Sequence, residues 1–147
     1  MSRQFSEREL AHFTERYIAM WNEPDTQARH QQVEQLWAVN GAQVLVDAPQ
    51  AMREALAVLS FPIPTVEIRG HDALNRRVDR AYEMFVAPGE YLFVPGGQAV
   101  ELSANLIGLT WLMVTAADRT VAGGGYDVIA LDDEGLIRWD HQYIGVA

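Results

Sequence analysis

The hydrophobic pattern of this 147-residue chain changes its period once, near residue 90, and does not change back. In the first part, apolar side chains recur every three or four residues, as on one face of a helix; Leu10, Tyr17 and Trp21 belong to the first such stripe. In the second part, apolar and polar residues alternate with the period of two that is typical of strands. Helices followed by a run of strands predict an α+β fold with an antiparallel sheet.

Caps and turn residues divide this pattern into elements. Ser6 and Glu9 form a capping box that begins the first helix. Asp25 caps a second helix, and we expect the pair Asn40-Gly41 to end it in a left-handed turn. The other expected elements are helices over residues 50–60 and 72–85 and strands over residues 43–47, 65–69, 91–94, 99–102, 106–115, 120–131 and 136–144.

Length, charge and composition exclude several classes of function. The length is that of one ordinary domain, so we expect a single domain over residues 1–147. The formal net charge of -9 argues against nucleic-acid and anionic membrane partners, which need a basic surface. The absence of cysteine excludes disulfides and thiolate chemistry. With no signal peptide and no apolar run of about 20 residues, we expect a cytoplasmic protein.

Asp127 is an unusual residue for its position, because it lies in a strand-like run that is apolar on both faces. It shares one face with Ile129 and Leu131, and Tyr126 and Val128 lie on the other. Burial disfavours the charged form of a carboxyl group, so a buried Asp127 would be neutral and would donate a hydrogen bond at neutral pH. The alternative is a structural aspartate that is bonded to backbone amides.

Three other polar residues are candidates for a site. Tyr17 lies on the apolar stripe of the first helix, where its hydroxyl needs a partner or faces a cavity. Asp47 ends the first strand just before a loop, where it either serves a site or caps the turn. His141 shares a strand face with Ile137 under simple alternation, so it either lines a pocket or is a satisfied sheet histidine.

No pattern in the sequence indicates a metal or a cofactor. The four histidines show no metal-ligand spacing, so we expect no metal site. The run Gly123-Gly124-Gly125 opens no helix and is followed by no Lys-Ser or Lys-Thr, so it is not a phosphate loop. We expect it to allow a bulge or a close approach of two backbones.

The sequence resembles the nuclear-transport-factor-2-like (NTF2-like) superfamily, and within it the SnoaL-like proteins, which include polyketide cyclases and ketosteroid isomerase-like proteins. The resemblance extends over nearly the whole chain, in order, and each of its motifs is loose. It rests on the segments Arg16-Tyr17-Ile18-Ala19-Met20-Trp21-Asn22, Leu36-Trp37, Val44-Leu45-Val46-Asp47-Ala48-Pro49, Arg69-Gly70-His71-Asp72-Ala73-Leu74 and residues 127–137.

This resemblance implies a cone-shaped, curved antiparallel sheet wrapped around three to four helices and enclosing an apolar pocket. It also implies a homodimer that packs through the outer face of the sheet, which would cover the second apolar face of residues 106–115. In the ketosteroid isomerases a tyrosine, a general-base aspartate and a protonated aspartate match the positions of Tyr17, Asp47 and Asp127. The use of a protonated aspartate in that isomerase is a known example of a shifted carboxyl pKa.

Three functions are compatible with these residues. The first is a cofactor-independent isomerase or cyclase: Asp47 removes a proton beside a carbonyl group, and Tyr17 and Asp127 donate hydrogen bonds to the enolate. The second is a non-catalytic module that binds an apolar small molecule. The third is epoxide hydrolysis, which needs an arginine in the pocket, a role that Arg138 could fill only by pointing inward. The aromatic residues expected to contact the ligand are Trp21, Trp111, Trp139 and Tyr143.

Overall fold

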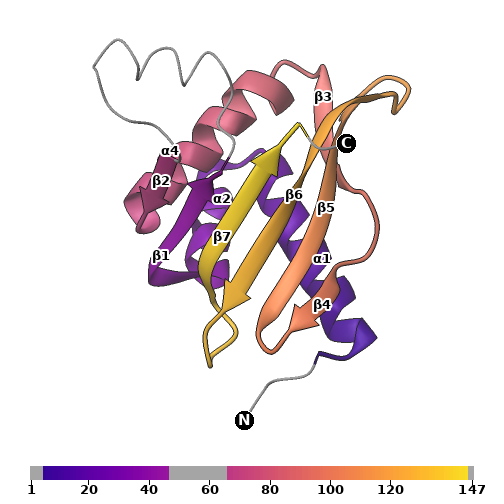
Figure 1. Ribbon diagram of the computed structural model, residues 1–147. Coiled ribbons are helices and arrows are strands. Elements are labelled where there is room, and N and C mark those ends of the chain that lie inside the picture. Colours follow the sequence, from indigo (N-terminus) through magenta and orange to yellow (C-terminus); the bar gives the residue numbers. More distant parts are fainter. Residues whose placement is uncertain (1–4, 47–65, 146–147) are drawn as a thin grey trace, which may run out of the picture.

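The computed structural model describes residues 5–46 and 66–145 of the chain (Figure 1). Within these ranges the helices are α1 (Glu7–Asn22), α2 (Thr26–Leu36), α4 (His71–Ala81) and a π-helical turn, η1 (Tyr82–Val86), that continues α4. The capping box of α1 is present, because Ser6 Oγ accepts from the Glu9 amide and the Glu9 side chain accepts from the Ser6 amide. None of the helices in these ranges is long and apolar enough to cross a membrane.

Seven strands form one mixed sheet in the described part of the chain. They are β1 (Trp37–Leu45), β2 (Val66–Arg69), β3 (Tyr91–Pro95), β4 (Val100–Ser103), β5 (Leu106–Thr115), β6 (Val121–Leu131) and β7 (Ile137–Ile144). Their order is β2-β1-β7-β6-β5-β3, and β4 pairs with the same edge of β5 as β3. All pairs are antiparallel except β1 with β7, which is parallel and joins the early strands to the late ones.

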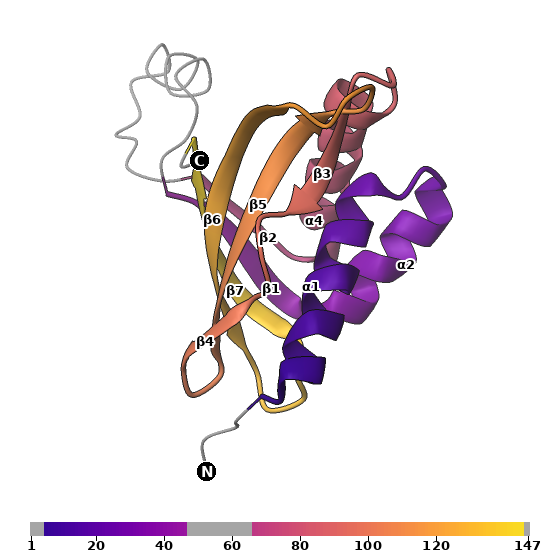
Figure 2. The same cartoon turned by 90° about the vertical axis from the view of Figure 1, so that its right-hand side faces the viewer.

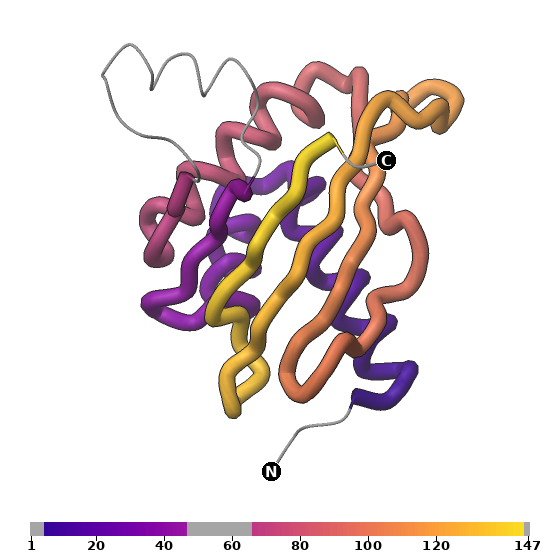
Figure 3. The backbone as a smooth tube through the Cα atoms, in the orientation of Figure 1, coloured from indigo at the N-terminus to yellow at the C-terminus, as the bar shows by residue number. Residues whose placement is uncertain are grey.

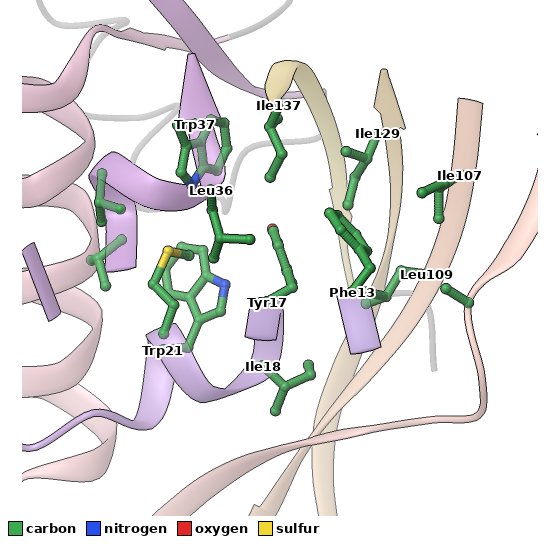
Figure 4. Close-up of a cluster of buried hydrophobic side chains, with 14 of the residues drawn as sticks. Phe13, Tyr17, Ile18, Trp21, Leu36, Trp37, Ile107, Leu109, Ile129 and Ile137 are labelled. Atoms are coloured by element: carbon green, nitrogen blue, oxygen red, sulfur yellow. The ribbon is translucent and has the colours of Figure 1, made fainter. Parts of the chain in front are cut away.

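The sheet is curved, and the helices cover its concave face (Figures 2 and 3). The side chain of Asn22, at the end of α1, both donates to and accepts from the backbone of Phe93 in β3, which fixes this helix against the sheet. Figure 4 shows the core between the two layers, where aromatic residues of α1 face isoleucines of β5, β6 and β7. The predicted α+β class with a curved sheet around three helices is confirmed.

The expected end of the second helix is wrong. Helix α2 ends at Leu36, and β1 begins at Trp37 without a connecting turn. Asn40 and Gly41 lie inside β1, at a shift in its register with β7 between Trp37 and Ala42. A Cβ atom on Gly41 would lie 2.6 Å from the carbonyl oxygen of Ile137. The glycine therefore allows a close approach of two strands, and it does not supply a left-handed helix end.

A second irregularity lies at the start of β7 and reverses its alternation. Ala130 pairs with Trp139, but the next residue, Leu131, pairs with Ile137, so Arg138 is an extra residue, a β-bulge. Ile137 points into the core, and Asp140 is the next residue of the strand to do so. Every later side chain of β7 lies on the face opposite to the one that simple alternation predicts.

The helix expected over residues 50–60, the first residue of the strand expected over 65–69, and Asp47 lie outside the described residues.

Candidate functional site

An apolar cavity of about 630 Å³ lies between α1, the α4–η1 segment and the concave face of the sheet. Its wall is mostly aromatic and aliphatic, as in sites for apolar small molecules. Apolar lining residues include Ile18, Trp21, Phe85, Phe93, Trp111 and Met113, and the polar ones are Tyr17, Arg77, Arg80 and Gln142.

Two buried carboxyl groups meet at the hydroxyl of Tyr17. Tyr17 Oη lies 2.9 Å from Asp127 Oδ2 and is also hydrogen-bonded to Asp140 Oδ2. Both aspartates are 0% exposed. They occupy diagonal positions on the inner face of β6 and β7, since Asp127 pairs with Gln142 and Asp140 with Ile129. The tyrosine reaches them from the buried stripe of α1.

The other contacts of Asp127 come from hydrogen-bond donors. Trp111 Nε1 donates to Oδ1 at 2.8 Å, and Gln142 Nε2 lies 3.3 and 3.2 Å from Oδ1 and Oδ2. An indole N–H can only donate, so this side of Asp127 must accept. Hydrogen bonds of this kind favour an ionised carboxylate.

Asp140 is the better position for a proton. Burial raises its pKa well above the ordinary range of a carboxyl group, and the charge of Asp127 raises it further. Burial also raises the pKa of Asp127, but its interaction with Asp140 and the hydrogen bonds from Tyr17, Trp111 and Gln142 oppose that change. We therefore assign one proton to the pair, on Asp140. Asp140 donates to Tyr17, and Tyr17 donates to the ionised Asp127.

Arg77 joins both carboxyl groups through two glutamines. Its Nε donates to Gln43 Oε1 at 3.1 Å, and its Nη2 donates to Gln142 Oε1 at 3.0 Å. Gln43 Nε2 donates in turn to Asp140 Oδ2 at 3.2 Å, as Gln142 does to Asp127. Each amide thus uses its acceptor on the guanidinium and its donor on a carboxyl group. The positive charge of Arg77 and one ionised carboxyl leave the cluster close to neutral.

The glycines of β6 keep Trp111 in place. A Cβ atom on Gly125 would lie 2.5 Å from Trp111 Cζ2 and 2.5 Å from the carbonyl oxygen of Tyr143. A shift in register between Met113 and Val114 lies nearby, opposite Gly123. The expected bulge and close approach at these glycines are confirmed.

Gly125→Ala should therefore displace the indole that donates to Asp127. We expect a loss of about 2–3 kcal/mol in the free energy of unfolding, because overpacking moves both a ring and a backbone segment. Urea denaturation followed by tryptophan fluorescence measures the loss. Gly123→Ala is the matched control, since its Cβ would meet only Met113 Cε, at 3.7 Å. An equal effect of both substitutions would contradict this reading of the packing.

Four of the residues predicted from sequence lie together and three do not. Tyr17, Trp21 and Trp111 line the cavity, and Asp127 lies directly behind Tyr17. Asp47 lies outside the described residues, so the general-base role stays a prediction.

His141, Trp139 and Tyr143 do not line the cavity. The placement of these three residues in the pocket is wrong, because the bulge at Arg138 turns them to the outer face of the sheet. There His141 stacks on Trp139, and the guanidinium of Arg69 lies 4.8 Å from the centre of the Trp139 ring. The predicted homodimer would use this face, and it stays a prediction.

Asp140, Arg77, Gln43 and Gln142 were not recognised from the sequence. Only Arg77 has a local signal: it lies three residues after Leu74 and four before Ala81, beside the buried stripe of α4. Asp140 lies between Trp139 and His141, which simple alternation places inward. That alternation would turn Asp140 outward, so no local pattern identifies it as a site residue. Among the described residues, no group of three or more His, Cys, Asp or Glu side chains could hold a metal ion.

No family model matches the sequence, and no protein of curated function matches it. Solved structures do match. A protein of the SnoaL-like family from Agrobacterium tumefaciens, described as a proposed isomerase, is 25% identical, with a TM-score of 0.70 over 92% of this chain and 96% of that one.

Two further structures agree in fold. An NTF2-like protein of unknown function from Exiguobacterium sp. 255-15 is 14% identical over 92% of this chain and 99% of that one, with a TM-score of 0.59. A protein of unknown function with a cystatin-like fold from Methylobium petroleophilum PM1 is 14% identical over 93% of this chain and 78% of that one, with a TM-score of 0.58. The fold of the chain is thus that of the NTF2-like superfamily, and its structural neighbours include SnoaL-like proteins.

Proposed function

We propose that the protein is a small-molecule enzyme that removes a proton next to the carbonyl group of a neutral, apolar compound, in an isomerase or cyclase reaction through an enolate. One observation carries the proposal: Tyr17, at the wall of an apolar cavity, is hydrogen-bonded to two buried carboxyl groups. Titratable groups with strongly shifted pKa values in a cavity are typical of sites for proton transfer.

The cluster has a base that needs no residue outside the described ranges. As Tyr17 Oη takes a proton from the substrate carbon, the proton of Tyr17 passes to Asp127, and the negative charge moves to the enolate oxygen. Tyr17 never becomes a free phenolate, which burial would disfavour, since burial and the two nearby carboxyl groups raise its pKa well above the ordinary value. Return of the proton to another carbon completes an isomerisation. In a cyclisation the enolate attacks a second carbonyl, and the proton returns through Tyr17 to the new alkoxide oxygen.

Exchange of hydrogen for deuterium tests proton removal without knowledge of the natural substrate. We expect the protein to accelerate exchange beside the carbonyl group of 2-tetralone, an apolar bicyclic ketone, in deuterated water, as followed by proton NMR. Tyr17→Phe should reduce the exchange rate about 100-fold or more, in the range of general acid–base catalysis. Tyr143→Phe, a tyrosine on the outer face of the sheet, is the matched control and should leave the rate unchanged.

Asp47→Asn distinguishes the two candidate bases. If the proton passes through Tyr17 to Asp127, this variant should keep the exchange rate of the wild type within about threefold, because the base of the described cluster is intact. A fall of 100-fold or more would assign the general-base role to Asp47, as the resemblance to ketosteroid isomerases implies. The same NMR experiment measures both outcomes.

Two other functions can be distinguished from the proposed one by assays with small-molecule probes. Tight binding of apolar ketones without any exchange would favour a non-catalytic binding module. Epoxide hydrolysis gains support from Arg77, because it supplies the cavity arginine that Arg138, exposed on the bulge of β7, does not. However, the hydroxyl of Tyr17 occupies the place between the carboxyl groups where a nucleophilic water would have to lie. Formation of a diol from styrene oxide would favour this reaction.

A further inference from the structure

We infer that Arg77 binds the carbonyl oxygen of the substrate and holds the negative charge of the enolate, with Tyr17 and Asp127 as a proton relay beside it. This inference rests on the proposed function and names a catalytic residue for it. It also restricts the substrate to a neutral molecule whose one essential polar atom is a hydrogen-bond acceptor.

The guanidinium of Arg77 has one edge fixed by protein and another that is unused. Its Nε and Nη2 donate to Gln43 and Gln142. Its Nη1 donates to no residue in the described part of the chain, and Arg77 lines the cavity. The group also lies 5.4 Å from the centre of the Trp21 ring, which is part of the cavity wall. Such a guanidinium is held in one orientation before any ligand enters, and that preorganisation is what stabilisation of a developing charge requires.

Tyr17 is a poor partner for the substrate oxygen in this arrangement. Its single proton is directed to Asp127, and one of its lone pairs accepts from Asp140, so the hydroxyl has a lone pair for a substrate proton and no proton to donate to a substrate oxygen. An oxyanion beside Tyr17 would also lie next to the ionised Asp127, and like charges in a buried site repel strongly. Arg77 is separated from both carboxyl groups by a glutamine, so it offers a positive charge at a distance from the negative one.

The charge balance then favours a neutral ligand. Before the reaction the cluster holds the positive Arg77, the ionised Asp127 and the neutral Asp140, with a net charge of zero. After proton transfer Asp127 is neutral and the enolate carries the negative charge beside Arg77, so the total is unchanged. An anionic ligand would add an uncompensated charge to a buried site, which is costly.

A pair of probes of similar shape tests the contact with oxygen. Wild-type protein should bind 2-acetylnaphthalene about tenfold more tightly than 2-ethylnaphthalene, as measured by fluorescence titration, because a hydrogen bond to a charged donor contributes at least that much. Arg77→Met should bind the two probes about equally. Arg76→Met is the matched control: this arginine of α4 is exposed and does not line the cavity, so its removal should leave the preference intact.

A second measurement reports the charge on the oxygen. 2-Naphthol resembles an enol, and its fluorescence distinguishes the neutral and ionised forms. Wild-type protein should lower the pKa of bound 2-naphthol by about one unit or more, and Arg77→Met should remove that shift, which a purely structural role would not do. If Arg77→Met does not fold, Arg77→Lys keeps the charge but not the two-sided fork, and it should retain only part of the shift.

Different results separate failure of the inference from failure of the proposed function. If Tyr17→Phe abolishes exchange of 2-tetralone and Arg77→Met does not, the function stands and the role of Arg77 is wrong. If neither the wild type nor any variant catalyses exchange, the proposed function is wrong. The two probe measurements still decide whether Arg77 binds an oxygen atom of the ligand. Tighter binding of 2-naphthoate than of 2-acetylnaphthalene would overturn the restriction to neutral ligands.

Discussion

Asp127→Asn should cost about 3 kcal/mol or more of the free energy of unfolding at pH 7, whereas Asp140→Asn should leave the protein as stable as the wild type or make it more stable. The two residues are chemically identical, fully buried, and bonded to the same hydroxyl. Their opposite responses follow from the position of the single proton that they share.

Asp127 accepts from Trp111, Gln142 and Tyr17, and it supplies the negative charge that balances Arg77. An amide at this position would turn an N–H group toward other donors, and it would leave the arginine without a counter-charge unless Asp140 gave up its proton. Removal of one partner from a buried charged network typically costs 3–5 kcal/mol. Asparagine at position 140 instead imitates a neutral acid, because its Nδ2 can donate to Tyr17 as the carboxyl O–H does.

Urea denaturation of both variants and the wild type at pH 7, followed by tryptophan fluorescence, measures the two differences. Asn22→Ala controls for the loss of a half-buried polar contact outside the carboxyl cluster, since in the described part of the chain the Asn22 side chain bonds the backbone of Phe93. The reverse order, with Asp140→Asn the strongly destabilised variant, would place the proton on Asp127. That was the expectation from the sequence, in which Asp127 is the neutral donor.

Much of the fold was accessible from the sequence because period and turn chemistry act locally. The strand expected over residues 106–115 coincides with β5, and the hairpin before β7 contains Gly135 with a φ of 84°, as its Asp-Asp-Glu-Gly sequence indicates. The apolar stripe of α1 predicted that Tyr17 is buried, and the alternation of β6 predicted that Asp127 points inward; both residues are buried in the structure. The resemblance to NTF2-like proteins then supplied the curvature of the sheet and the pocket, which no local pattern encodes.

The errors come from irregular strand pairing, which has no consistent local signal in the sequence. The bulge at Arg138 turned His141 outward and Asp140 inward, so half of the carboxyl pair was missed. The shift in register near Gly41 changed an expected helix end into the middle of a strand. Gln43 was missed for a related reason. It belongs to the site because β1 pairs in parallel with β7, which places Gln43 beside Asp140, and the sequence does not show which strands are neighbours.

The stability of the protein should depend on pH in a direction opposite to that of most carboxyl groups. Burial raises the pKa of Asp140 in the folded state, so the folded protein binds this proton more tightly than the unfolded chain does. The resulting stabilisation is complete below the unfolded pKa, near 4. It is lost as pH rises through the folded pKa.

The difference between Asp140→Asn and the wild type isolates this effect from the other acidic residues. At about pH 4 the variant should be less stable by about 1–2 kcal/mol, because Gln43 Nε2 then loses its acceptor. As pH rises, the variant should gain on the wild type by up to roughly 1.4 kcal/mol per pH unit, the value for one proton, and overtake it before pH 7. Denaturation curves at each half unit from pH 4 to 8 measure the difference. A difference that stays constant over this range would mean that Asp140 is ionised in the folded protein, and Tyr17 would then receive no hydrogen bond from Asp140.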